Sequence, residues 1–250
     1  MNAQRSPDLL DRVALVVGGA SGIGASIARA FCAEGAVVIV ADRDSDVVSA
    51  AAEEIAAAGS ATMDVRDFAS VQAAVSGVVA QYGRIDVLVN SAGILTESPL
   101  IEMSPEQWQE TIDVDLTGVF LCCRAVVPHM VSRASGRVIN MASQLGIKGG
   151  RGLTHYSAAK AGVIGLTKAL ALEVAEHNVL VNAIAPGPVD TPMVAGISDT
   201  WKAAKVNELP LGRFGSPEEI APTAVLLASD PGGNLYVGQT LGPNSGDVMP

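Results

Sequence analysis

Short runs of apolar residues alternate along the chain with longer stretches in which apolar residues recur every three or four positions. The short runs predict buried strands, and the spaced stretches predict amphipathic helices. Strands that alternate with helices throughout, without an internal linker, predict a single doubly wound α/β domain with a parallel sheet of about seven strands flanked by helices on both faces. The predicted strands are residues 12–17, 36–41, a short segment ending at 63–65, 87–90, 136–142, 179–184 and 239–241.

The ends of the predicted helices carry residues that favour capping or termination. Serine and aspartate side chains can accept hydrogen bonds from the free N–H groups of a first turn, and glycine readily adopts the left-handed conformation that ends a helix. In two places a serine is followed directly by proline and, three residues after the serine, by glutamine or glutamate. This spacing is that of a capping box, with proline at the first helical position. The expected caps are Ser45, Asp67, Ser104 and Ser216, and the expected ends are Gly35, Gly59 and Gly83.

The alternation is interrupted between residues 186 and 215. This segment contains turn residues, followed by a short amphipathic piece with Met193, Val194, Trp201 and Val206. Connections inside a compact domain are usually only a few residues long, so we expect residues of about 187–215 to form a lid over the substrate. The chain is then one domain over residues 1–250, with an N-terminal tail at 1–10 and this lid.

Composition narrows the class of protein. Of the 250 residues, 49% are hydrophobic and only 4% aromatic, which suits buried parallel strands under closely packed helices. The net charge of −10, without a basic run, argues against nucleic acid or an anionic membrane as a partner. The N-terminus lacks the apolar core of a signal peptide, and uninterrupted apolar runs are far shorter than the ~20 residues of a membrane span. We therefore expect a cytoplasmic protein.

The cysteines predict neither a disulfide nor a metal site. Cys32, Cys122 and Cys123 each lie inside an apolar helical pattern, and adjacent cysteines do not normally pair with each other. They are interpreted as reduced core thiols. Further ligands at metal-binding spacing are absent from the sequence, so no metal is expected.

A glycine-rich turn follows the first predicted strand. Gly18, Gly22 and Gly24 stand between that strand and an amphipathic run, and Ser21 and Ile23 lie within the same turn. Glycines allow the backbone to approach a pyrophosphate closely, and the N-terminus of the following helix attracts its charge. Glycines also mark plain tight turns, but the position between a first strand and a first helix favours dinucleotide binding.

Asp42 ends the second predicted strand, eighteen residues after Gly24. An acidic residue at about this distance accepts hydrogen bonds from the adenosine ribose of a dinucleotide. A 2′-phosphate beside this carboxylate would meet roughly 4 kcal/mol of repulsion per charge pair at ~4 Å and an effective dielectric constant of ~20. NAD is therefore favoured over NADP, although the neighbouring Arg43 is able to soften that preference by binding a phosphate.

Tyr156 and Lys160 are four residues apart on a predicted helix, and Ser143 ends the predicted strand before it. Residues at this spacing lie on one face of a helix, so the phenol and the ammonium are neighbours. A tyrosine held as phenolate at neutral pH costs about 4 kcal/mol, and a nearby cation recovers part of this. Tyr156 is thus a candidate general acid/base, Lys160 its electrostatic helper and Ser143 a partner for a substrate oxygen.

Taken in order, these motifs resemble those of the short-chain dehydrogenase/reductase family over roughly residues 11–246. The glycine turn and the Ser–Tyr–Lys spacing are similar to the family's, and so are three further segments. By this resemblance, Asp64 and Val65 contact the adenine, and a second segment ends a strand beside the cofactor. A third holds the nicotinamide carboxamide. The strand end supplies Asn90, Ala92 and Gly93. The carboxamide segment supplies Pro186, Gly187, Val189 and Thr191.

The resemblance implies a Rossmann-type fold, a homotetramer, and hydride transfer between NAD and a carbinol carbon. Tyr156 would exchange the hydroxyl proton, Ser143 would steady the substrate oxygen, and Lys160 would bind the nicotinamide ribose. At the position of the family's fourth catalytic residue, an asparagine, this chain has Asp115. An ionised Asp115 raises the pKa of both Lys160 and Tyr156. We therefore expect activity that rises at alkaline pH, and an Asp115→Asn profile shifted to lower pH.

Two smaller departures concern the framework. Val17 precedes the glycine turn where the family usually has threonine, which removes a hydroxyl that braces the turn. Near the C-terminus, Asn244-Ser245-Gly246 replaces the usual Asp-Gly-Gly. We expect this second change to alter packing more than chemistry.

Three functions remain open. The leading hypothesis is an NAD-dependent dehydrogenase acting on a secondary alcohol or ketone, a small or medium-sized metabolite. The alternative is a 3-oxoacyl-[acyl-carrier-protein] reductase using NADPH, which Asp42 disfavours and which needs a basic docking patch, for which Arg133 and Arg137 are the candidates. The third is a nucleotide-binding sensor without turnover, which would keep its function in Tyr156→Phe. Candidate substrate contacts are Gln144, Lys148, Arg151, Leu153, His155, Met193 and Trp201.

Overall fold

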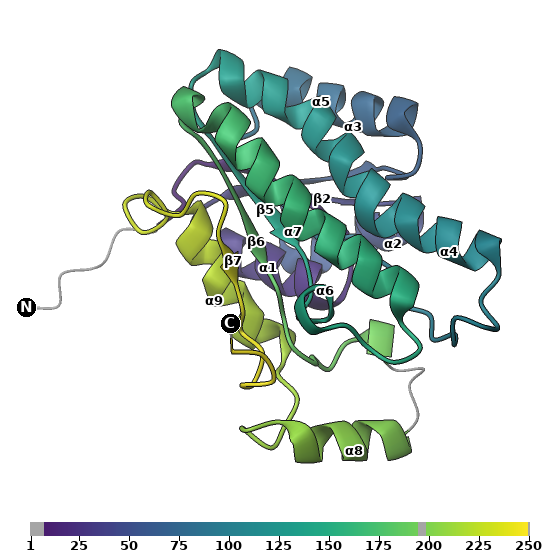
Figure 1. Ribbon diagram of the computed structural model, residues 1–250. Coiled ribbons are helices and arrows are strands. Elements are labelled where there is room, and N and C mark those ends of the chain that lie inside the picture. Colours follow the sequence, from purple (N-terminus) through teal and green to yellow (C-terminus); the bar gives the residue numbers. More distant parts are fainter. Residues whose placement is uncertain (1–7, 195–198, 250) are drawn as a thin grey trace, which may run out of the picture.

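The computed structural model describes residues 8–194 and 199–249, and its centre is a parallel β-sheet (Figure 1). The strand order is β3-β2-β1-β4-β5-β6-β7, and every neighbouring pair is parallel. The predicted sheet of about seven parallel strands is therefore confirmed. The strands are β1 (Val13–Val17), β2 (Val37–Asp42), β3 (Gly59–Thr62), β4 (Val87–Asn90), β5 (Gly136–Met141), β6 (Val179–Ile184) and β7 (Thr240–Leu241).

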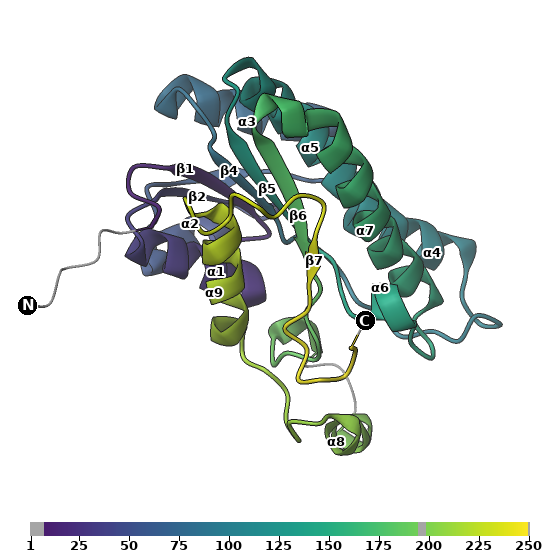
Figure 2. The same cartoon turned by 60° about the vertical axis from the view of Figure 1, so that its left-hand side comes forward.

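Helices connect these strands and cover both faces of the sheet (Figures 1 and 2). Helices α1, α2 and α9 pack on one face, and α3, α5 and α7 pack on the other. They are α1 (Gly22–Ala33), α2 (Ser45–Ile55), α3 (Phe68–Tyr82), α4 (Pro105–Ile112), α5 (Gly118–Ser132), α6 (Leu145–Lys148), α7 (Thr154–Val174), α8 (Asp199–Glu208) and α9 (Pro217–Ala228). A π-helical turn (Asp113–Thr117) joins α4 to α5, and short 3₁₀ turns cover Ala175–His177 and Pro192–Val194.

The two cores meet along the central strands, because successive side chains of a strand point to opposite faces. In β1, Leu15 and Val17 pack with α3, α5 and α7, whereas Ala14 and Val16 pack with α1, α2 and α9. All five residues of β1 are buried. This explains why the central strands appear as uninterrupted apolar runs rather than as an alternating pattern.

The sheet also fixes where a ligand site can form. Strand β1 lies between β2 and β4, so the connections leaving β1 and β4 run to opposite sides. In an open parallel sheet, such a reversal leaves a crevice beyond the carboxyl ends of the strands. The glycine turn after β1, Asp42 at the end of β2 and Ser143 shortly after β5 all lie at this rim.

Several predicted boundaries were wrong by a few residues. The cap of α2 is Asp44 and not Ser45, because its carboxylate accepts from the N–H groups of Asp46 and Val47. That helix ends at Ile55, with Ala56 in the left-handed region, and Gly59 instead begins β3. Tertiary packing sets these ends, while the capping boxes at Ser104 and Ser216 and the cap Asp67 are confirmed.

The N-terminal boundary differs from the sequence prediction as well. Leu9, expected in a tail over residues 1–10, is fully buried, and its N–H donates to the carbonyl of Glu34 at 3.0 Å. The packed part of the chain therefore already includes Leu9, within the predicted tail.

One helical stretch of the described chain has the length and apolar composition of a membrane span. It is Pro105–Ser132, which comprises α4, the π turn and α5. Within its most apolar window, 44% of the residues are buried inside the protein, and α5 packs on the sheet. A core helix of an α/β domain has these same properties, so the stretch is weak grounds for a membrane span.

Candidate active site

A cleft of about 700 Å³ lies at the carboxyl ends of the strands. This volume is in the range of sites for small molecules and cofactors. Most of the residues predicted from the sequence line it, although they come from segments spread over the whole chain. They are Gly18, Ser21, Gly22, Ile23, Gly24, Asp42, Arg43, Asp64, Val65, Ala92, Gly93, Ser143, Gln144, Leu153, Tyr156, Lys160, Pro186, Gly187, Val189, Thr191 and Met193.

Four predicted residues are placed otherwise, and one of them, His155, is fully buried. Asn90 and Asp115 are buried and do not line the cleft. Trp201 belongs to α8, but its side chain lies outside the part of the chain that the structure describes.

The glycine turn between β1 and α1 forms a narrow cradle. Gly18 and Gly22 have φ angles of +72° and +53°, which only glycine adopts at little cost. A Cβ atom on Gly24 would lie 2.1 Å from the carbonyl oxygen of Gly18, so a side chain there would push the turn open. The first turn of α1 contains no acidic residue, and Ser21 makes no side-chain cap to it. The N–H groups at this end of α1 are therefore suited to an anion such as a pyrophosphate.

Asp42 and Arg43 lie side by side on the cleft wall at the end of β2. One carboxylate oxygen of Asp42, Oδ1, accepts from the N–H of Arg43 at 2.8 Å. This hydrogen bond orients the carboxylate while leaving Oδ2 for a ligand hydroxyl. Arg43 also lines the cleft, so both residues that bear on the choice between NAD and NADP are present there.

Asp64 follows β3, and Arg66 binds its carboxylate in a bidentate manner. Nη2 of Arg66 lies 2.7 Å from Oδ2, and Nε lies 3.0 Å from Oδ1. The hydrogen bond from Arg66 holds the pKa of Asp64 at about 2. The Asp64 carboxylate is thus already paired. Arg66 also lines the cleft, although no sequence motif marks it.

Asn90 anchors the framework from beneath the cleft. Its side-chain amide donates to Oδ1 of Asn140 at 2.8 Å, and Asn140 in turn donates to Oγ1 of Thr167 at 2.9 Å. This buried chain links β4, β5 and α7. Asn90 therefore fixes the spacing of the strands that carry the cleft, and its side chain lies beneath the cleft instead of lining it.

Ser143, Tyr156 and Lys160 converge on the cleft as their spacing predicts. Tyr156 and Lys160 lie on α7, and Nζ of Lys160 is 5.4 Å from the centre of the Tyr156 ring. The ammonium of Lys160 also donates to the carbonyl of Met141 at 3.2 Å. Oγ of Ser143 accepts from the N–H of Leu145 at 3.1 Å, which orients the hydroxyl at the start of α6.

Asp115 lies directly behind Lys160. Its side chain is fully buried, and Oδ2 is 3.2 Å from Nζ of Lys160, an ion pair without hydrogen-bond alignment. Oδ1 accepts from the N–H of Ile94 at 2.8 Å. Asp115 occurs in the π turn, a feature found frequently at functional sites.

These neighbours shift the pKa of the central groups. Burial raises the pKa of Tyr156, and the charge of Asp115 adds to it, while Lys160 and a hydrogen bond with Ser143 act in the opposite direction. Burial alone would lower the pKa of Lys160, but Asp115 and Tyr156 together outweigh it and raise the pKa. The expected influence of Asp115 on both groups therefore has the predicted sign.

The other candidate side chains divide between the wall and the interior. Lys148 and Arg151 line the cleft. His155 is fully buried, and its Nε2 lies 3.0 Å from Oγ1 of Thr96, so it packs the loop after β4 rather than facing a substrate. Lys205, Glu208 and Phe214 line the cleft from the 187–215 segment, and no local sequence signal distinguished them.

The arginines considered for carrier docking are engaged elsewhere. Arg137 is only 4% exposed, and its guanidinium donates to Asn234 at 2.7 Å. Arg133 pairs with Asp86 at 2.9 Å. The two side chains do not form the free basic patch that an acidic carrier protein would need.

Taken together, the cleft fits a nicotinamide dinucleotide in its chemistry. A glycine cradle at the start of α1 suits the pyrophosphate, and Asp42 suits a ribose hydroxyl. Among the described residues, no group of three or more histidine, cysteine or acidic side chains is arranged to hold a metal. Tyr156, with Ser143 and Lys160 beside it, supplies the cleft with a candidate group for acid/base chemistry.

Comparisons with known proteins agree with this geometry. The family model described as enoyl-(acyl carrier protein) reductase matches residues 18–246. The crystal structure of gox2181 is similar, with a TM-score of 0.93 and 34% sequence identity, covering 97% of each chain.

Curated relatives match over nearly the whole chain. The 3-oxoacyl-[acyl-carrier-protein] reductase FabG of Thermotoga maritima is 40% identical over 242 residues, which is 95% of this chain and 98% of that protein. The (2S)-[(R)-hydroxy(phenyl)methyl]succinyl-CoA dehydrogenase subunit BbsD of Thauera aromatica is 40% identical over 235 residues, covering 92% and 94%.

Proposed function

The chain belongs to the short-chain dehydrogenase/reductase family, and we propose that it interconverts 3-oxoacyl and 3-hydroxyacyl thioesters with NAD(H). As a family member it is an oxidoreductase that binds a nicotinamide dinucleotide. The observation that carries the proposal is the convergence of Ser143, Tyr156 and Lys160 in the cleft that also contains the glycine cradle.

The names of the relatives support a thioester substrate. Both relatives are named for acyl groups, carried on a carrier protein in one case and on coenzyme A in the other. They favour the acyl alternative over the more general secondary alcohol with which the sequence analysis began. Because Arg133 and Arg137 are engaged within the protein, we propose coenzyme A rather than an acidic carrier protein as the acyl carrier.

The position of Asp42 supports NAD(H) as the cofactor. Its carboxylate lies on the cleft wall at the end of β2, where a 2′-phosphate would be repelled. Arg43 is adjacent, but its N–H is the group that holds the Asp42 carboxylate in place. The proposal therefore keeps NAD(H), with Arg43 as the residue whose guanidinium could reverse the preference.

The mechanism follows from the side chains in the cleft. In the oxidative direction Tyr156, as phenolate, removes the proton of the substrate hydroxyl, and in reduction the phenol returns it. Lys160 stabilises the phenolate by its charge, and the Ser143 hydroxyl holds the substrate oxygen within reach of Tyr156. The nicotinamide ring, when bound, supplies or accepts the hydride. The buried setting of Tyr156 and Lys160 keeps water from weakening these interactions.

Steady-state reduction of acetoacetyl-CoA tests this proposal. We expect consumption of NADH with kcat/KM at least tenfold above that with NADPH, a difference of about 1.4 kcal/mol. The same acyl group on purified acyl carrier protein and a simple methyl ketone serve as comparison substrates. Turnover of the ketone alone would refute the thioester assignment, and a preference for NADPH would show that Arg43 overrules Asp42.

We also propose that the protein assembles as a homotetramer, as the family resemblance implied. Apolar side chains on the outer surface of α5 and α7 support this, since Phe120 is 50% and Leu172 is 84% exposed in the single chain. Light scattering coupled to size-exclusion chromatography would measure the mass directly. A monomer at micromolar concentration would contradict the proposal.

A further inference from the structure

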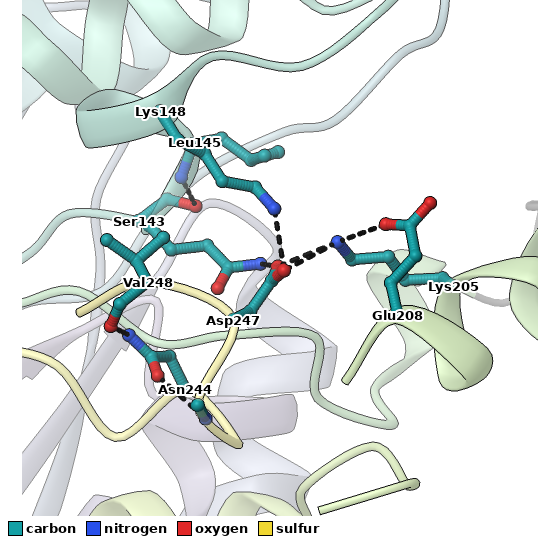
Figure 3. A network of polar contacts seen from close by, with 10 residues as sticks. Ser143, Leu145, Lys148, Lys205, Glu208, Asn244, Asp247 and Val248 are labelled. Carbon is teal, nitrogen blue, oxygen red and sulfur yellow. Dashed lines mark hydrogen bonds and ion pairs between the residues drawn. The ribbon is translucent and has the colours of Figure 1, made fainter. Parts of the chain in front are cut away.

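Asp247, close to the C-terminus, collects side chains from the substrate side of the cleft (Figure 3). Its own side chain is only 5% exposed. Nζ of Lys148 lies 2.7 Å from Oδ1, and Nζ of Lys205 lies 2.7 Å from Oδ2. The amide of Gln144 donates to the same carboxylate. This carboxylate belongs to none of the motifs used above.

The partners of Asp247 come from separate segments that all border the cleft. Gln144 directly follows Ser143, and Lys148 ends α6. Lys205 belongs to α8, within the 187–215 segment. Each of these three side chains lines the cleft. The carboxylate therefore connects the loop that carries Ser143 to the helix that borders the substrate end.

The tail that presents Asp247 is itself held in place. Asn244 accepts from the N–H of Gly246 at 3.0 Å and donates to the carbonyl of Val248 at 2.8 Å. The N–H of Asp247 donates to the carbonyl of Asn244 at 3.0 Å. Ser245 accepts from the N–H of Leu211 at 3.2 Å, just beyond α8. The position of the carboxylate is thus fixed by the turn and does not depend on the lysines alone.

The turn also packs closely against Pro210 and Gly187, which leaves little room for another conformation. Gly246 has a φ angle of +83°, and a Cβ atom there would lie 2.8 Å from Cγ of Pro210. A Cβ on Gly187 would lie 2.6 Å from Cα of Asn244. The segment Asn244-Ser245-Gly246, which departs from the family pattern, therefore forms the turn that positions Asp247.

The charges in the cluster favour lasting ion pairs between Asp247 and the two lysines, Lys148 and Lys205. Burial alone would raise the pKa of Asp247, but the hydrogen bonds and charges of Lys148 and Lys205 hold it below its ordinary value. The carboxylate is thus ionised at neutral pH. Lys205 is also largely buried, with 9% of its side chain exposed. Among the described residues, losing Asp247 would leave it Glu208 as an acidic partner, whose side chain is 64% exposed.

We propose that Asp247 is a positioning residue that ties α8 to the loop following Ser143 and thereby sets the substrate end of the cleft. Its effect on turnover rests on the proposed function, whereas its effect on α8 does not. The two effects are measured separately so that failure of one assignment is distinguishable from failure of the other.

Native-state amide hydrogen exchange of the full chain without substrate tests the structural part. In Asp247→Asn, which keeps the shape and removes the charge, we expect exchange in α8 to become about tenfold faster while the central strands are unchanged. Glu208→Gln is the matched control, because it removes a carboxylate from the same Lys205 but lies within α8. We expect exchange in this control to stay within about twofold of the wild type.

Two results would overturn the proposal. Unchanged exchange of α8 in Asp247→Asn would show that the carboxylate does not hold the helix. Equal acceleration in Asp247→Asn and Glu208→Gln would show that Lys205 merely needs a counter-ion. A third variant, Lys205→Met, should speed exchange in the wild-type background and add little in Asp247→Asn, since the two substitutions break the same link.

Kinetics tests the functional part. With acetoacetyl-CoA we expect Asp247→Asn to raise KM by about tenfold, with kcat within about threefold and the Kd of NADH unchanged. A general loss of folding would change all three values together. Faster exchange without a change in KM would leave Asp247 as a structural link only and would refute its role at the substrate end. If the wild type does not turn over the thioester at all, the exchange experiment still decides whether Asp247 holds α8.

Discussion

The two ends of the cleft are constructed differently. At the cofactor end, the glycine turn follows β1 and Asp42 is the last residue of β2, and we expect backbone N–H groups to do most of the binding. At the substrate end, the polar side chains of Gln144, Lys148 and Lys205 are already bound to Asp247. The cofactor end thus offers Oδ2 of Asp42 and the start of α1 to a ligand, whereas three polar side chains of the substrate end are held by one carboxylate of the protein itself.

This difference suggests that the two ends of the cleft have separate roles, one in binding the cofactor and the other in shaping the substrate site. We expect the cofactor end to bind through a backbone geometry that depends on Gly18 and Gly24, where a side chain would clash. The substrate end sets the position of α8 through a charge network drawn from distant segments, so it can vary without disturbing the cofactor. Tyr156 and Lys160 lie where the two ends meet, and Asp115 lies behind them. Substitutions at the cofactor end, at the substrate end, at Tyr156 and at Asp115 should therefore change different measured quantities.

The largest effect is expected at the junction. Tyr156→Phe removes the hydroxyl that exchanges the proton, so kcat should fall by about a thousandfold. NADH should still bind with a Kd within twofold of the wild type, because the cofactor end is unchanged. Stopped-flow turnover and fluorescence titration measure the two values. Residual activity within tenfold of the wild type would show that another group moves the proton.

The next largest effect is expected in the glycine cradle. Gly24→Ala places a Cβ atom against the carbonyl of Gly18, so the Kd of NADH should rise by about a hundredfold, roughly 2.8 kcal/mol. Gly77→Ala is the control, since a Cβ there meets open space in the middle of α3. It should instead raise the free energy of unfolding by about 0.5 kcal/mol and leave NADH binding unchanged. Equal NADH affinity in both variants would refute the cradle.

A smaller effect, on selectivity, is expected at Asp42. Asp42→Ser removes the charge that repels a 2′-phosphate and leaves Arg43 beside the site. The preference for NADH over NADPH should fall by about tenfold, mainly through tighter binding of NADPH. Titration of each cofactor at a fixed salt concentration provides the ratio. A ratio equal to that of the wild type would mean that Asp42 does not face the adenosine ribose.

The smallest effect in magnitude is a pH shift at Asp115. The carboxylate raises the pKa of Tyr156, and alcohol oxidation requires the phenolate, so the wild-type rate should rise toward alkaline pH. Asp115→Asn should move the midpoint of this rise to lower pH by about one unit.

The control for this shift is Asp113→Asn, in the same π turn. Its carboxylate accepts from Gln109 at 2.7 Å and does not contact Lys160. The pH profile of this variant should match that of the wild type. Equal profiles for Asp115→Asn and the wild type would remove Asp115 from the catalytic group.

The sequence predicted the cofactor end better than the substrate end, for a physical reason. The glycines, Asp42, Tyr156 and Lys160 are placed by local rules, because strand ends and helix spacing determine where they lie. The π turn that brings Asp115 to Lys160 has no such local signal, and neither does the inward rotation of Asn90 toward Asn140.

The charge network illustrates the limit most clearly. The sequence makes Lys148 a candidate substrate contact, but its ammonium is bound by a carboxylate 99 residues further along the chain. Contacts of this kind depend on how the C-terminal turn packs beside Gly187 and Pro210, and periodicity and spacing do not encode it.

The measurement that tests the account most directly is a crossed comparison of Asp42→Ser and Asp247→Asn. The Kd values of NADH and NADPH and the KM of acetoacetyl-CoA would be determined for both variants and the wild type. We expect Asp42→Ser to change only the cofactor ratio and Asp247→Asn to change only KM, each by about tenfold. If either variant changed both quantities to the same extent, the cleft would not be divided into two independent ends.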